Sequence, residues 1–169
     1  MDAEVKHIYS QPVLDLVTVG AEYCRYLEAR EPHTEDDFLR VMGGLLPMIY
    51  LKAALLDGGP EAEGWNAHKV TEDDYNYVRS AVAAALGADD DFLDFPGGRH
   101  DGECAVCTVS ECLADVYQQL RELVEAFRQG YEDAMEAALA EAREEFALQW
   151  GRKLLAALHA LHNLRFGEE

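Results

Sequence analysis

The feature that most constrains this chain is the spacing of its apolar residues, which recur every three or four positions along nearly its whole length. Such spacing places apolar side chains on one face of an α-helix. One row keeps a strict interval of four: Ala134, Ala138, Ala142, Phe146 and Trp150. No segment of any length alternates with the period of two that is typical of a strand. The pattern predicts an all-α fold, a compact bundle of about six helices with no sheet.

The predicted helices are separated by turn-forming residues. Thr34 and Thr71 each precede three acidic residues, which is the pattern of a helix N-terminus. An irregular loop is expected at about 88–107, followed by a long helical segment at about 108–166 that serves as the spine of the bundle. The length suits one hydrophobic core, so we expect a single all-helical domain over 1–169.

The charge balance limits the classes of partner. The chain has 33 acidic and 14 basic residues, a net charge of −19. Binding to phosphate backbones needs clustered lysine and arginine, so we expect no direct binding to nucleic acid or to an anionic membrane. The chain has no apolar run of transmembrane length and no secretion signal, which predicts a cytoplasmic location. An acidic surface favours a protein partner with a basic surface, and a homo-oligomer is also considered.

One short stretch, HDGECAVCTVSEC, gathers potential metal ligands: His100, Cys104, Cys107 and Cys112. Zinc and iron–sulfur sites need four soft ligands, whereas this stretch has only one C-x-x-C pair. The segment Thr108–Glu111 has the pattern of a capping box, which would place Cys112 in the core as a helical residue. A redox role is a second alternative, because Cys107 precedes a predicted helix N-terminus. The residues favour a loop leading into a helix cap, with no metal and no cofactor.

Catalytic signatures are missing from the sequence. It contains no phosphate-binding loop, nucleophile elbow or dinucleotide fingerprint, so we name no catalytic residue and favour a non-enzymatic protein. The leading hypothesis is an acidic accessory domain that binds another protein. The alternatives are a small metal- or thiol-dependent protein using Cys104 and Cys107, and a helical sensor of small molecules. Tyr117, Trp150 and His159 are candidates for a groove.

Several segments together resemble a known family: LVTVGAEYCRYLE, LLPMIYLKAALL, VTEDDYNYVRSAVAAALG, VSECLADVYQQLRELVEAFRQG and QWGRKLLAALHALHNL. The family consists of small, all-helical bacterial proteins and is known as a domain of unknown function. The similarity spans nearly the whole chain. It implies a single all-α domain from the bacterial cytosol, and it brings no activity, cofactor or catalytic residue with it.

Overall fold

The chain folds into helices joined by short connections, as a computed structural model shows for residues 6–56, 58–59, 61–62, 64–97 and 102–167. Within these residues the α-helices are α1 (Gln11–Leu27), α2 (Glu35–Ala54), α3 (Glu72–Leu86), α4 (Val109–Gln129), α5 (Glu132–Glu145) and α6 (Gly151–Phe166). Shorter helical turns are η1 (His7–Tyr9), η2 (Gly87–Asp90) and the π-helical turn η4 (Phe146–Trp150). No helix in the described part of the chain is long and apolar enough to cross a membrane.

Side chains and backbone geometry fix the helix ends. The Thr34 hydroxyl accepts a hydrogen bond from the backbone N–H of Asp37. Thr71 does the same for Asp74, whose carboxylate accepts a bond in return from the Thr71 N–H. Both predicted N-caps are therefore confirmed. Gly130 ends α4 with a φ of 81°, a left-handed conformation that favours glycine.

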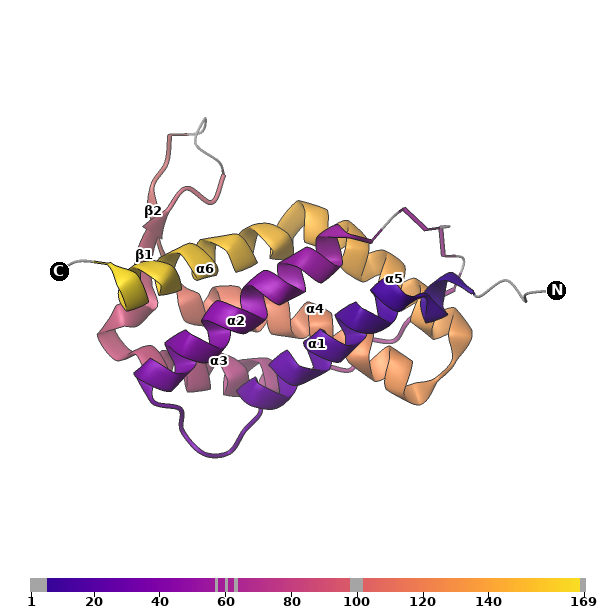
Figure 1. The fold of residues 1–169 in the computed structure, drawn as a ribbon, viewed down its shortest axis with the longest axis horizontal. Helices are drawn as coiled ribbons and strands as arrows, with labels where there is room; N and C mark the ends of the chain where they lie inside the picture. Colours follow the sequence, from indigo (N-terminus) through magenta and orange to yellow (C-terminus); the bar gives the residue numbers. More distant parts are fainter. Residues whose placement is uncertain (1–5, 57, 60, 63, 98–101, 168–169) are drawn as a thin grey trace.

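Helix α4 lies at the centre of the bundle, in contact with α1, α3, α5 and α6, while α2 packs against α1 and α6 (Figure 1). The buried apolar side chains of α4 form the main core together with aliphatic and aromatic residues from the other helices. Cys112 is part of this core, as the capping pattern at Thr108 predicted. The prediction of a compact, predominantly helical bundle is confirmed.

The expectation of no sheet is wrong at one place. Strands β1 (Asp91–Asp94) and β2 (Ala105–Thr108) form a two-stranded antiparallel sheet within the segment expected to be an irregular loop. Each strand has only four residues, too few for a period of two to be recognised in the sequence. The hairpin projects from the end of the bundle at which the C-terminus lies (Figure 1).

A buried contact holds the base of the hairpin on the bundle. Asp90, the last residue of η2, accepts hydrogen bonds from the Ser110 N–H at 2.8 Å and from the Ser110 hydroxyl at 2.6 Å. Thr108 ends β2 and also caps α4, because its hydroxyl accepts a bond from the Glu111 N–H. The start of β1 and the end of β2 are therefore both fixed relative to α4.

The connection before α3 is held by a buried carboxylate. Glu122 on α4 accepts bonds from the N–H of Lys69 at 2.8 and 2.9 Å and from that of Val70 at 2.7 Å. Nearby, His68 Nε2 lies 3.0 Å from Glu141 Oε1 on α5, and this hydrogen bond raises the pKa of His68. These contacts tie the segment before α3 to α4 and α5.

Candidate functional site

An open groove of about 780 Å³ lies between the hairpin and α6. One wall consists of Asp94–Pro96 and all four residues of β2. The other wall consists of the end of η4 and the part of α6 up to His159, and the first turns of α4 lie between the two walls. The groove therefore depends on the hairpin, which the helical periodicity did not predict.

The two cations that line the groove, Arg152 and Lys153, each form a polar contact within the chain. Asp115 on α4 accepts a hydrogen bond from the Tyr75 hydroxyl at 2.6 Å and pairs with Lys153 Nζ at 2.6 Å. Burial and this bond raise the pKa of Tyr75, so the phenol stays protonated as a donor. Arg152 donates a bond to the Pro96 carbonyl at 3.3 Å, which links α6 to the hairpin.

Apolar side chains are exposed along both walls. Phe95 and Val106 from the hairpin are 41% and 67% exposed, and Leu148 and Leu155 from η4 and α6 are 59% and 45% exposed. Single exposed apolar residues are ordinary, but four that line one hollow form a surface suited to binding. The arrangement is an apolar groove with polar groups at its base.

The three cysteines of the predicted ligand set are not assembled into a metal site within the described part of the chain. Cys104 is exposed beside the hairpin, Cys107 is partly exposed in β2, and Cys112 is buried in α4. His100, the fourth member of the predicted set, lies outside the described residues. Within the described part of the chain, no three His, Cys, Asp or Glu side chains are arranged to hold a metal ion.

The two cysteines that line the groove, Cys107 and Cys112, have thiols with raised pKa values. Burial raises the pKa of Cys107, and nearby acidic groups add to the effect. Burial likewise raises the pKa of Cys112 to about 12. Because the thiolate is the reactive form, both thiols are poor nucleophiles near neutral pH. The raised pKa values therefore disfavour the thiolate at Cys107 and at Cys112.

The three residues suggested as a groove have separate environments. Tyr117 is buried and donates a hydrogen bond to Glu28, the residue that follows α1, at 2.8 Å. Trp150 is buried and donates through Nε1 to the Ala142 carbonyl at 2.8 Å. Of the three, only His159 lines the groove beside α6.

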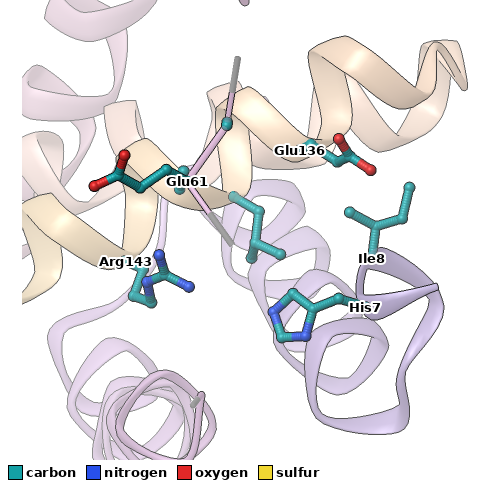
Figure 2. A pocket seen from close by; sticks show the side chains of 8 residues that line it. His7, Ile8, Glu61, Glu136 and Arg143 are labelled. Carbon is teal, nitrogen blue, oxygen red and sulfur yellow. The ribbon is translucent and has the colours of Figure 1, made fainter. Parts of the chain in front are cut away.

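A second hollow, between η1 and α5, is far smaller. The side chains of His7 and Arg143 face each other across it, with Glu61 and Glu136 nearby (Figure 2). Its free volume of about 30 Å³ suits a water molecule and not a metabolite. We therefore assign no binding role to it.

The fold and the groove define a class of small, predominantly helical domain that carries a β-hairpin against its last helix. A profile of the family described as "Domain of unknown function (DUF5063)" matches residues 7–167, and the chain belongs to this family. The resemblance seen in the sequence is thus confirmed.

A solved structure supports the fold. The chain is similar to the crystal structure of protein BF1032 from Bacteroides fragilis, a Northeast Structural Genomics Consortium target, with 32% sequence identity and a TM-score of 0.83. The similarity covers 97% of this chain and 98% of that one. The search of curated proteins found no match.

Proposed function

We propose that this chain is a non-enzymatic accessory domain of the bacterial cytoplasm that binds a partner protein in the groove between the hairpin and α6. The observation that carries the proposal is the set of four exposed apolar side chains on its two walls: Phe95, Val106, Leu148 and Leu155. Burying them against a partner would remove their apolar surface from water, which drives most protein association. The four free thiols are in keeping with a reducing compartment.

The net charge indicates the character of the partner. At −19 the chain attracts basic surfaces over long range and repels acidic ones. Steering of this kind raises the rate of encounter, while the apolar walls supply the contact itself. The proposed partner therefore has a basic surface around an apolar segment.

Another apolar surface provides a control. Met48 and Leu51 on α2, and Leu55 just after it, are exposed apolar residues, but none of them lines the groove. Leu51 is exposed to nearly the same degree as Leu148, 53% against 59%. A partner that needs the hollow will contact Leu148 and not Leu51.

Site-specific crosslinking in cells tests the proposal. Benzoylphenylalanine is placed at Leu148 or at Leu51, the cells are irradiated, and the crosslinked proteins are identified by mass spectrometry. The expected result is a protein captured from Leu148 and not from Leu51, and lost when Leu155→Glu is added. Equal capture from both positions would contradict binding in the groove. A product of two copies of this chain would point to a homo-oligomer.

Binding of a small apolar molecule is a second candidate function, favoured by the volume of the groove. Volumes of this order are common among small-molecule sites. A thermal-shift screen against apolar metabolites tests it. Saturable stabilisation that Leu155→Glu removes and Leu51→Glu leaves intact would support it, and a flat response across the panel would reject it.

A further inference from the structure

We propose that the groove takes up an extended, basic segment of the partner as a third strand on the free edge of β2. The inference rests on the proposed function, because it specifies the kind of segment and how it is held. Strand addition of this kind uses backbone hydrogen bonds for affinity and alternate side chains for specificity.

The sheet leaves an edge available. In a two-stranded sheet each strand pairs along one edge, and the other edge keeps unpaired N–H and C=O groups. All four residues of β2, Ala105–Thr108, line the groove, whereas β1 contributes only Asp94. Because successive side chains point to opposite faces of a strand, consecutive lining residues indicate that the edge of β2 borders the groove.

The walls select an alternating segment. A strand added beside β2 would place every second side chain on one face. Val106 on β2 and Leu155 on α6 offer apolar contacts on opposite walls of the groove. The segment therefore needs an apolar residue at every second position, with the intervening side chains free to be charged.

The charges of the groove favour basic residues at those intervening positions. Arg152 and Lys153, the cations of the α6 wall, already have partners within the chain. Asp94 and Glu111 also line the groove, and neither forms an ion pair with another of the described residues. Asp91, exposed at the start of β1, adds a further negative charge nearby. With Asp115, three carboxylates line the groove against the two cations Arg152 and Lys153, so the charge of these groups favours a basic ligand.

The same charges disfavour a second copy of this chain as the occupant. Pairing two β2 edges would bring together two chains of net charge −19, and with them the carboxylates of both grooves. Exposed strand edges with nearby charges commonly resist self-pairing for this reason. The same negative charge that opposes a dimer attracts a basic partner.

Synthetic peptides test the backbone pairing directly. The parent probe is a fluorescent ten-residue peptide that alternates lysine and valine. Two derivatives carry N-methyl groups, one on every valine and the other on every lysine, so that charge and composition stay matched. A fourth peptide replaces lysine by glutamate. Affinity for the full chain is measured by fluorescence anisotropy at 0.15 M salt, together with hydrogen exchange of the β2 amides.

Strand addition predicts an unequal effect of the two methylations. Only one set of peptide N–H groups would face β2, so one derivative should bind about tenfold more weakly than the other. The parent should also slow exchange in Ala105–Thr108, and the glutamate peptide should bind at least about tenfold more weakly than the parent. Two methylated peptides that bind alike would overturn strand addition, as would unchanged exchange in β2.

Protein variants separate this inference from the proposed function. Leu155→Glu should weaken the parent peptide, whereas the control Leu51→Glu should not. If Leu155→Glu weakens binding while both methylated peptides match the parent, the groove binds its ligand without a third strand. If Leu155→Glu binds as well as the unaltered protein, both proposals fail. A dimer that Val106→Lys abolishes would replace the basic segment with a second copy.

Discussion

The contact between Glu122 and the segment before α3 gives a prediction that can be worked out from the structure. Glu122 is only 8% exposed, and its two oxygens accept the N–H groups of Lys69 and Val70. Replacing it with alanine removes the acceptor for both donors. Glu122→Gln keeps one oxygen as a neutral acceptor and loses the charge.

The expected magnitude follows from the two donors. A hydrogen bond to a charged group stabilises by about 1.5–3 kcal/mol. Lys69 is exposed and Val70 only partly buried, so water can reach the freed N–H groups and the low end applies. We expect Glu122→Ala to lower the free energy of unfolding by about 2–3 kcal/mol. Glu122→Gln should cost about half as much, because neutral hydrogen bonds are roughly half as strong.

Urea unfolding followed by circular dichroism measures the effect. With an m-value of about 2 kcal/mol/M, the midpoint should fall by about 1 M for Glu122→Ala and about 0.5 M for Glu122→Gln. Hydrogen exchange should accelerate at Lys69 and Val70. Gln118→Ala, an exposed change on the same helix, is the control. A midpoint for Glu122→Ala that stays within about 0.2 M of the unaltered protein would refute the reasoning.

Three further predictions concern other contacts. Gly20→Ala should raise the melting temperature by about 2–4 °C, because alanine restricts the unfolded chain and its Cβ would meet neighbours at an ordinary 3.6 Å. Gly151→Ala should lower the melting temperature, because its Cβ would lie 2.5 Å from the Phe146 carbonyl oxygen. Burial raises the pKa of Cys112 to about 12, whereas the pKa of an unfolded cysteine is about 8.5. The contribution of the protonated thiol to the free energy of unfolding is therefore fully present below about pH 8.5 and is lost as the pH rises towards 12, by about 2 kcal/mol at about pH 10. Cys112→Ala should flatten this loss. The hydrogen bond to Glu141 raises the pKa of His68, so this contact stabilises the fold below about pH 6.5 and its contribution is lost as the pH rises through the pKa of the folded protein. His68→Ala should therefore remove a pH-dependent part of the free energy of unfolding of a few tenths of a kcal/mol.

Each of these three has an outcome that would contradict it. Melting curves in which Gly20→Ala and Gly151→Ala shift in the same direction would contradict the packing argument. Urea titrations at increasing pH measure the thiol effect, and an alkaline slope unchanged by Cys112→Ala would remove it. The exposed Glu144→Ala on α5 is the control for His68→Ala. Equal pH dependence in the two variants would show that the His68 contact contributes nothing measurable.

The helices were accessible to sequence reasoning because their signals are local. Thr34 and Thr71 cap their helices through hydroxyl oxygens within three residues of the N–H groups that they accept from, so the pattern alone sufficed. The hairpin was not, because its pairing joins residues 91–94 to residues 105–108 across the long connection 95–104, whereas a hairpin is recognised in a sequence by a turn of about two residues between its strands. The sequence therefore predicted the bundle and missed one wall of the groove.

Tyr117, Trp150 and His159 have separate environments for a different physical reason. A period of three to four residues identifies the apolar face of a helix, but it does not say which neighbour that face meets. Tyr117 meets α1 through Glu28, while Trp150 bonds back to Ala142. The different partners of Tyr117 and Trp150 are set by how the helices pack against one another, and no local sequence pattern encodes that packing. His159 lines the observed groove because it lies on the exposed side of α6.

The π-helical turn η4 has a consequence for how this domain can diverge. A π turn accommodates one residue more than the α-helical ladder requires. Deleting one residue between Phe146 and Trp150 would therefore restore the regular ladder from α5 into α6, and Leu155 would keep its place on the wall opposite β2. Deleting one residue between Gly151 and Leu155, in regular α-helix, would instead rotate the rest of α6 by about 100° and take Leu155 away from that wall. A homologue one residue shorter at the π turn would thus keep the apolar surface of the groove, whereas one shortened within α6 would lose it.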